Sequence, residues 1–376
     1  MKILYVTTIG MTMGFFKDLI KGLIDKGHIV DIATNRKIFE VPNCYYEWGC
    51  KVFDISTSRS PFKISNLRAI KQIKLLAVNY DIVHCHTPVA GIVTRLACRK
   101  LRKEQKVKVV YTAHGFHFYN GAPKKNWIFY YPIEKLCSKY TDVLITINKE
   151  DYNLAKEKMN SKSVIFIPSV GINTERYSSC VFDVAKKRQE LGIPTDAIVL
   201  ISVGELNKNK NHAVVLKALA DLKSSNYHYV IAGEGNQRNK LLKESKKLGV
   251  NLHLLGFRKD IPELFKISDI NVFPSIREGF GLAAIEGIAS GVPTICAKNR
   301  GTLTFGNDGE NCLFFEHNDY KSLSKLIKYL LGDNKKYFKL ANNFQEIRKL
   351  YDVASINLEM ENLYLSLMNF PVSEKE

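Results

Sequence analysis

Residues 270–296 read INVFPSIREGFGLAAIEGIASGVPTIC, and this stretch decides the fold. The apolar run 270–273 is typical of a short buried strand, and residues 293–296 are typical of a second one. Between them, a glycine-rich turn opens an apolar stretch long enough for a helix. A strand, a helix and a strand in this order predict one repeat of a parallel sheet covered by helices.

The same alternation extends along most of the 376 residues. One set of expected strands lies at residues 3–7, 29–34, 51–55, 82–84, 108–112, 143–147 and 163–167. A second set lies at residues 197–203, 227–232, 251–254, 270–273 and 293–296. Because the chain is longer than a usual single domain, these sets predict an α/β protein with two Rossmann-like, doubly wound domains.

The composition of the connecting segments indicates where the domains meet. We expect a first domain over residues 1–170, a linker over 171–194, and a second domain over 195–350. The linker contains Pro, Gly and Ser but has weak periodicity. Residues 351–376 are expected to add a final helix, whose apolar side chains fall on one face.

Charge is concentrated in the first half of the chain. The formal net charge is +18, and residues 1–168 hold 27 Lys and Arg against 13 Asp and Glu. Such a surplus suits an anionic partner: a nucleic acid, a phospholipid surface or a phosphorylated substrate. No apolar run approaches the ~20 residues needed to cross a bilayer, and the N-terminus does not read as a signal peptide. We therefore expect a cytoplasmic protein.

Two carboxylates flank the glycine-rich start of the helix in the opening stretch. Gly279 and Gly281 allow a ligand to approach the backbone, and the N–H groups at the helix start can bind a diphosphate. Glu286, just over one turn into the helix, could accept hydrogen bonds from both hydroxyls of a ribose, and Glu278 could reach a sugar beyond the phosphates. The alternative is that Glu278 only caps the helix and that Glu286 is a solvated surface acid.

Two other loops follow expected strands of the second domain. Residues 202–212 read SVGELNKNKNH, in which Lys208 and Lys210 could contact phosphate oxygens. Residues 232–235 read AGEG. Both loops are expected at the carboxyl edge of the sheet, where ligands bind in folds of this kind. Taken alone, residues 202–212 are interpreted as a solvated polar loop and residues 232–235 as a tight turn.

Together these stretches resemble the retaining glycosyltransferases of family 4, and the resemblance covers nearly the whole chain. Its motifs are E-G-F-G-x-x-x-x-E at residues 278–286, G-E-L-N-K-N-K-N at 204–211 and I-P-S-V-G-I-N at 167–173. The resemblance implies the GT-B fold, in which two Rossmann-like domains face one another and a C-terminal helix crosses back to the first. Within the family, residues 111–121 and the G-E-L-N loop look like the branch that builds capsular or exopolysaccharide repeat units.

The resemblance also implies roles for single residues. Lys210 would neutralise the donor diphosphate, Glu286 would hold the ribose and Glu278 would contact the donor sugar. His114 matches the family histidine beside the reacting sugar carbon, so His114, Lys210 and Glu278 are the catalytic candidates. The other donor-binding candidates are Gly10, Gly14, Gly204, Glu205, Lys208, Gly233, Arg258, Gly279, Phe280, Gly281, Leu282 and Ala283.

One position departs from the family pattern. Many members have arginine directly after the glycine of the phosphate loop, where this chain has Glu205. Lys208 is the nearest residue that could replace the missing cation.

The resemblance implies a reaction without a metal or other cofactor, in which the leaving phosphate takes the acceptor proton. The chain lacks the Asp-x-Asp motif that would hold a divalent ion in the other main glycosyltransferase fold. His84 and His86 could suggest a metal site, and so could His117 near His114. A third ligand is not evident for either pair, so a structural or cleft-lining role is favoured.

Residues 116–131 combine aromatic side chains with Lys124 and Lys125, a composition suited to a bilayer surface; ordinary helix packing is the alternative. We therefore expect a peripheral enzyme at the inner face of the cytoplasmic membrane. It would move a sugar, most simply from a UDP-sugar, to a lipid-diphosphate-linked saccharide. The alternatives are a UDP-sugar 2-epimerase of the same fold and a basic nucleic-acid-binding protein.

Overall fold

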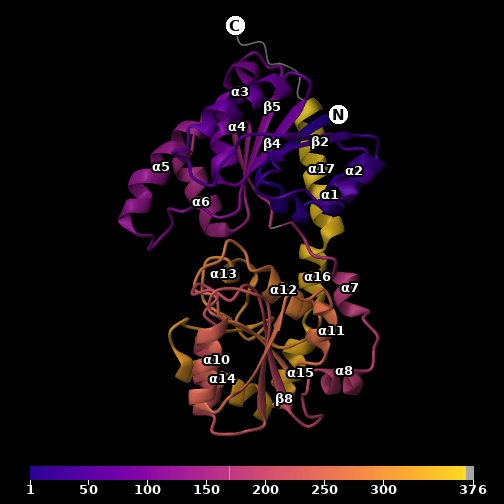
Figure 1. Ribbon diagram of the computed structural model, residues 1–376, viewed down its shortest axis with the longest axis vertical. Helices are drawn as coiled ribbons and strands as arrows, with labels where there is room; N and C mark the ends of the chain where they lie inside the picture. The colour runs from indigo at the N-terminus through magenta and orange to yellow at the C-terminus, as the bar shows by residue number, and fades with distance from the viewer. Residues whose placement is uncertain (169, 370–376) are drawn as a thin grey trace. The chain divides into compact units, whose positions relative to one another are not determined.

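The computed structural model describes residues 1–168 and 170–369, which divide into two compact units (Figure 1). The first unit contains Met1–Gly171 and the chain from Val353 onward. The second unit is Ile172–Asp352. Residues 171–194, expected as a linker, therefore belong almost entirely to the second unit, where they form two short helices, α7 (Thr174–Ser178) and α8 (Val184–Glu190).

The first unit is built on a seven-stranded parallel sheet in the order β3-β2-β1-β4-β5-β6-β7. Its strands are β1 (Lys2–Ile9), β2 (Ile29–Asn35), β3 (Val52–Asp54), β4 (Ile82–His86), β5 (Lys108–Ala113), β6 (Val143–Thr146) and β7 (Ser163–Phe166). All seven were predicted. The strand order reverses between β1 and β4, and ligands of doubly wound sheets bind at such a switch point.

Helices cover both faces of this sheet. They are the 3₁₀ helix η1 (Gly10–Phe15), α1 (Lys17–Asp25), α2 (Cys44–Glu47), α3 (Ser65–Ala77), α4 (Pro88–Lys103), α5 (Lys124–Ser138), α6 (Lys149–Lys158) and α17 (Val353–Asn369). One apolar core contains residues of α3, α4 and α6, and a second contains residues of α1, α2 and α17. The sheet is therefore buried on both sides, as a parallel sheet requires.

The C-terminal helix α17 completes the second of these cores, although its sequence lies far from the rest of the unit. Ile356, Met360, Leu363 and Tyr364 are buried on one face of the helix, as the periodicity predicts. In Figure 1, α17 is the yellow helix beside α1 and β2. The hydroxyl of Tyr364 lies 2.6 Å from the hydroxyl of Tyr5 and forms a 2.6 Å hydrogen bond with Nδ1 of His84.

The second unit has a six-stranded parallel sheet in the order β10-β9-β8-β11-β12-β13. Its strands are β8 (Ile198–Val203), β9 (Tyr227–Ala232), β10 (Asn251–Gly256), β11 (Ile270–Phe273), β12 (Thr294–Ala297) and β13 (Leu313–Phe315). Five were predicted, and β13 was missed because three residues are too few to show a period. The order reverses between β8 and β11, so the loops after these strands lie at the switch point.

The remaining helices surround this second sheet. They are α9 (His212–Asp221), α10 (Arg238–Leu248), α11 (Ile261–Lys266), α12 (Leu282–Ala289), α13 (Thr302–Phe305), α14 (Tyr320–Gly332), α15 (Asn334–Asn342) and α16 (Gln345–Tyr351). Among residues 1–168 and 170–369, no helix has the length and apolar character needed to cross a bilayer.

Candidate active site

The loops after β8 and β11 are tied together by asparagine side chains and backbone. The carbonyl of Asn209 accepts a 2.8 Å hydrogen bond from the N–H of Ile276, and Nδ2 of Asn209 donates to the carbonyl of Arg277 at 2.8 Å. Asn211, in a left-handed conformation directly before α9, donates to the carbonyl of Pro274. Lys210 is therefore held against the chain that leads into α12.

Lys210 and Glu278, both predicted to be catalytic, form an ion pair. Nζ of Lys210 lies 2.7 Å from Oε1 of Glu278, and about a fifth of each side chain is exposed. The stem of Lys210 passes over Gly204, where an added Cβ would lie 3.3 Å from Cε of the lysine. The alternative that Glu278 only caps the helix is therefore wrong, because its carboxylate is the counter-ion of Lys210.

The start of α12 presents backbone donors beside this pair. Gly281, at the N-cap, has a φ of 114°, which favours glycine, and it has no side chain to accept from the first turn. The N–H groups of Leu282 and Ala283 belong to that turn, and both residues are half-buried. A helix start with uncapped amides next to a lysine suits an anionic oxygen.

The turn before α12 is fixed by the side chain of Phe280. Its ring is buried, with its centroid 5.7 Å from that of Phe305 and 5.4 Å from that of Tyr351. An added Cβ at Gly301 would lie 2.5 Å from the carbonyl oxygen of Phe280, so this close approach requires glycine. The Phe280 side chain thus anchors the turn, and only its backbone is available to a donor. Gly279, between Glu278 and Phe280, is half-buried.

Glu286 lies farther along α12 and is not a solvated acid. Its side chain is half-buried beside Tyr177 of α7. Burial raises the pKa of the Glu286 carboxyl, while the Tyr177 hydroxyl and the positive charge of Arg176 act in the opposite direction. Tyr177 was not identified from the sequence, because α7 lies in the segment read as a linker.

Replacement of Glu286 by alanine is expected to weaken UDP binding by about tenfold or more, because two hydrogen bonds from a ribose to a carboxylate would be lost. Titration calorimetry with UDP measures the change. Glu316, an exposed carboxylate elsewhere in the same unit, is the matched control, and Glu316→Ala should bind UDP as the wild type does. Unchanged affinity in Glu286→Ala would remove the ribose assignment.

Two of the predicted glycines are explained by backbone packing, and a third is not. An added Cβ at Gly233 would lie 1.9 Å from the carbonyl oxygen of Gly204, so the loops after β8 and β9 can touch only at glycine. In the first unit, Gly10 approaches the backbone of Phe39 in the same way, at 2.3 Å. Gly14 is exposed and would meet no atom within 4 Å.

The charged residues of the phosphate loop point in different directions. Glu205 is exposed and accepts a hydrogen bond from Nδ2 of Asn207 at 2.9 Å. Lys208 is exposed and lines a small cavity of about 110 Å³ with Lys240 and Glu244. Lys208 thus lies beside α10, whereas Lys210 contacts Glu278.

Arg258, the candidate for the base, is engaged in an ion pair. Its guanidinium donates to both carboxylate oxygens of Asp260, at 2.8 and 2.5 Å, and Lys187 lies 2.6 Å from the same carboxylate. The Arg258 guanidinium keeps the pKa of Asp260 well below its usual range. Because this side chain is engaged, Arg258 would contact the nucleotide base through its backbone, as the family resemblance implies.

In the first unit, His114 follows β5, is half-buried and packs against the rings of His86 and Phe16. Its Nε2 lies 3.2 Å from Nδ1 of His86. Burial lowers the pKa of His114 to about 4 and that of His84 to about 3. Among the described residues there is no group of three or more metal-ligating side chains. The two ring nitrogens of His84 hydrogen-bond to the hydroxyls of Tyr364 and Thr112. These bonds give His84 a structural role, which the sequence analysis favoured over a metal site.

Comparison with known proteins identifies the family. Residues 2–148 match the model of glycosyl transferase 4-like domains, and residues 183–347 match that of glycosyl transferases group 1. The putative glycosyltransferase EpsD of Bacillus subtilis (strain 168) is 39% identical over 332 residues, which cover 86% of this chain and 87% of EpsD. The chain belongs to the glycosyltransferases.

Other relatives of this glycosyltransferase have more specific names. An Escherichia coli UDP-Gal:alpha-D-GlcNAc-diphosphoundecaprenol alpha-1,3-galactosyltransferase is 27% identical over 80% of this chain and 83% of its own. Crystal structures of Anabaena HepE, which is 20% identical, superpose over 97% of this chain and 100% of HepE. Their TM-scores are 0.83 for the complex with UDP and 0.81 for that with UDP-glucose. The fold is therefore GT-B, with two Rossmann-like domains and a C-terminal helix that belongs to the first.

One further residue beside the ion pair of this glycosyltransferase was missed. Arg300, after β12, directs Nε toward the carbonyl oxygen of Glu278 at 3.4 Å. Residues 298–301 read KNRG and follow a predicted strand, so the rule that selected the loops after β8 and β9 would also have selected them.

Proposed function

We propose that this glycosyltransferase moves a sugar from a UDP-sugar to a lipid-diphosphate-linked saccharide, with retention of anomeric configuration, in the synthesis of a capsular or exopolysaccharide. The observation that carries the proposal is the contact between Lys210 and Glu278 beside the uncapped start of α12. This arrangement offers a cation and backbone donors to a diphosphate, and a carboxylate to the sugar attached to it.

The donor and acceptor are proposed from the relatives. HepE has been crystallised with UDP and with UDP-glucose, and the E. coli relative is named for a UDP-sugar and a lipid-linked diphosphate acceptor. By the family resemblance, Glu286 would hold the ribose of UDP. The sugar is a hexose or an N-acetylhexosamine.

The chemical role of the site follows from where charge grows. As the sugar leaves the donor, negative charge increases on the diphosphate, and Lys210 together with the α12 amides would stabilise it more in the transition state than in the ground state. Because these groups supply the positive charge, we propose a metal-independent reaction. Lys210 would exchange part of its contact with Glu278 for the phosphate, which would leave the Glu278 carboxylate to accept from sugar hydroxyls.

The first unit is proposed to meet the acceptor and the membrane. It carries most of the positive charge, and α5 exposes Ile128 next to Lys124. Exposed apolar side chains with adjacent lysines suit the headgroup region of an anionic bilayer. We place the enzyme peripherally at the inner face of the cytoplasmic membrane.

Two alternatives make different predictions. A UDP-sugar 2-epimerase would bind the donor but transfer its sugar to no acceptor. A nucleic-acid-binding protein would explain the net charge, but the chain carries no recognisable nucleic-acid module. Its binding to DNA would depend on salt and would not require UDP.

The test is incubation of the purified protein with a panel of UDP-sugars and a lipid-diphosphate-linked N-acetylhexosamine, with and without EDTA. We expect mass spectrometry to find one added hexose or N-acetylhexosamine on the acceptor, NMR to find the anomeric configuration of the donor retained, and EDTA to have no effect. Epimerised donor without transfer would support the first alternative. Salt-sensitive DNA binding without UDP affinity would support the second.

A further inference from the structure

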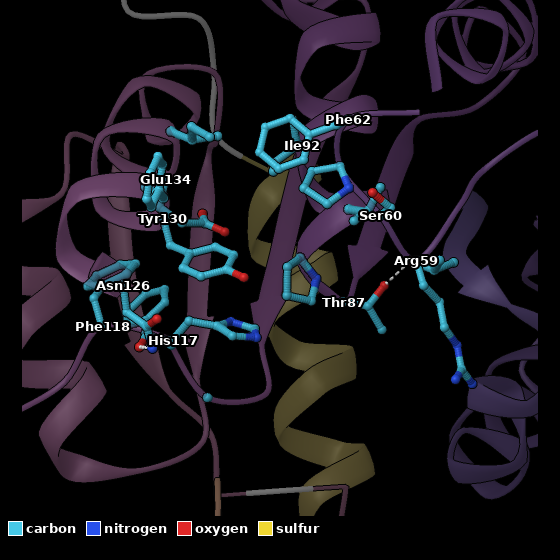
Figure 2. A pocket seen from close by; sticks show the side chains of 18 of the residues that line it. Arg59, Ser60, Phe62, Thr87, Ile92, His117, Phe118, Asn126, Tyr130 and Glu134 are labelled. Atoms are coloured by element: carbon cyan, nitrogen blue, oxygen red, sulfur yellow. Dashed lines mark hydrogen bonds between the residues drawn. The ribbon is translucent and has the colours of Figure 1, made fainter. Parts of the chain in front are cut away.

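A cavity in the first unit lies at the carboxyl ends of β1, β4 and β5. Its volume is about 690 Å³, and it is lined from the end of β1, the loop after β3, the start of α4, the loop after β5, and α5. Figure 2 shows Phe118, Asn126 and Tyr130 on one side and Ser60, Phe62 and Thr87 on the other. All of its lining residues belong to the first unit, whereas Lys210 and Glu278 belong to the second.

The wall of this cavity is largely apolar and aromatic. Phe116 and Phe118 are buried in it with their rings stacked 4.8 Å apart, and the ring of Tyr130 stacks on that of His117 at 4.6 Å. Ile92, Phe129 and Ile133 line it as well. Such a wall favours an apolar chain over free water.

Five of the polar side chains in the wall are already engaged with protein groups. Glu134 accepts from Nη2 of Arg95 at 2.7 Å and from the hydroxyl of Tyr111 at 3.2 Å, and the Arg95 guanidinium lies 4.0 Å from the centre of the Tyr111 ring. The hydroxyls of Thr8 and Thr87 lie 2.6 Å apart. Asn126 donates to the carbonyl of His117. A sugar could hydrogen-bond to these five side chains only if existing bonds were broken.

The mouth of the cavity has the opposite character. Arg59 and Lys125 line it and are both exposed, and the structure records no ion pair or hydrogen bond for either side chain within the described residues. In Figure 2 the guanidinium of Arg59 points away from the aromatic rings. Phe62 and Phe129, which also line the cavity, are 82% and 60% exposed. The site therefore has an apolar interior, a cationic edge and apolar side chains that continue outward.

We propose that this cavity binds the lipid carrier of the acceptor: the first isoprene units lie in the apolar interior, and Arg59 and Lys125 bind the diphosphate at the mouth. The inference rests on the proposed function and names the part of the acceptor that this enzyme recognises. Two cations match the charge of a diphosphate better than that of a single phosphodiester. Both a prenyl diphosphate and a bilayer phospholipid present phosphate oxygens, but the charge match favours the prenyl diphosphate.

The test is titration calorimetry of the full chain with farnesyl diphosphate in saturating UDP, so that the diphosphate cannot occupy the donor site. We expect one saturable site, with affinity about tenfold or more above that for inorganic diphosphate or farnesol. Inorganic diphosphate lacks the prenyl chain, and farnesol lacks the diphosphate. Phosphatidylglycerol vesicles should not displace the ligand. Displacement by the vesicles, or equal affinity for inorganic diphosphate, would overturn the proposal.

Matched variants locate the site. Arg59→Ala combined with Lys125→Ala should weaken binding of farnesyl diphosphate by about tenfold or more. Lys124→Ala, an exposed neighbour that does not line the cavity, should not change it. Phe129→Ala should weaken binding, whereas Ile128→Ala, 67% exposed and outside the lining, should leave it unchanged. Equal effects in a variant and its control would overturn the assignment.

An activity measurement separates this inference from the proposed function. With a lipid-linked acceptor, the Arg59→Ala, Lys125→Ala double variant should show a raised KM for the acceptor and an unchanged KM for the donor. If the double variant transfers sugar with wild-type constants for both substrates, the cavity is not the carrier site, although the enzyme remains a glycosyltransferase. If the wild type transfers no sugar but binds farnesyl diphosphate as described, the proposed function fails and the prenyl diphosphate site remains.

Discussion

Replacement of Lys210 by alanine is expected to lower kcat by about 10²-fold to 10³-fold, the size of effect seen when one preorganised donor is removed from a developing anion. Lys210 is the cation next to the α12 start, and its Nζ is held 2.7 Å from Glu278. The stem of the lysine is packed against Gly204, so its position is fixed before a donor binds. Initial rates with a UDP-sugar and a lipid-linked acceptor measure the loss.

Two controls make this result specific. Lys208→Ala should retain most of the activity, because Lys208 is exposed beside α10. Lys210→Arg should recover only part of it, because a planar guanidinium differs in shape from an ammonium group. Full activity in Lys210→Ala would contradict the diphosphate assignment. A strong loss in Lys208→Ala would instead support Lys208 as the substitute for the arginine that Glu205 replaces.

The second large effect is expected at His114. Family resemblance assigns this histidine to the reacting sugar, so His114→Ala should lower transfer by about 10²-fold or more while UDP affinity stays unchanged. His228→Ala, at a buried histidine of the second unit that contacts His253, is the control and should leave both quantities unchanged. A parallel loss of UDP binding in His114→Ala would indicate a general structural defect and contradict the assignment.

Burial also gives this histidine a pH signature. Because its pKa is lowered to about 4, His114 is neutral from about pH 5.5 upward, and kcat should show no titration of this residue near the ordinary value of 6.5. The unfolded chain takes up this proton near pH 6.5, so the stability that the neutral ring contributes is present above that pH. It is lost as the pH falls from 6.5 through 4.

Much of the fold could be predicted from the sequence, because parallel sheets bury continuous apolar runs between glycine-rich turns. The strands of the first sheet and the apolar face of α17 followed from periodicity alone. Periodicity could not show that Ile172–Asp352 closes on itself as a unit, because α7 and α8 are too short to have a visible amphipathic pattern. β13, with three residues, is likewise too short to show a period.

The site was predicted by residue type and by position at the ends of strands. That reasoning identified Lys210 and Glu278, but it could not show that they contact one another, because their pairing depends on Asn209 and Ile276 joining two loops. It also missed Tyr177, which lies beside Glu286 and comes from the segment expected as a linker. Gly233 was predicted to serve the donor, which stays a prediction; its close packing against Gly204 could not be predicted from the sequence.

A crystal structure of the protein with UDP bound would show directly where the diphosphate lies. We predict the diphosphate at the N–H groups of Leu282 and Ala283, with Nζ of Lys210 within hydrogen-bonding distance of a phosphate oxygen and the ribose hydroxyls on the carboxylate of Glu286. A diphosphate bound away from the start of α12, with Lys210 still paired only to Glu278, would contradict it.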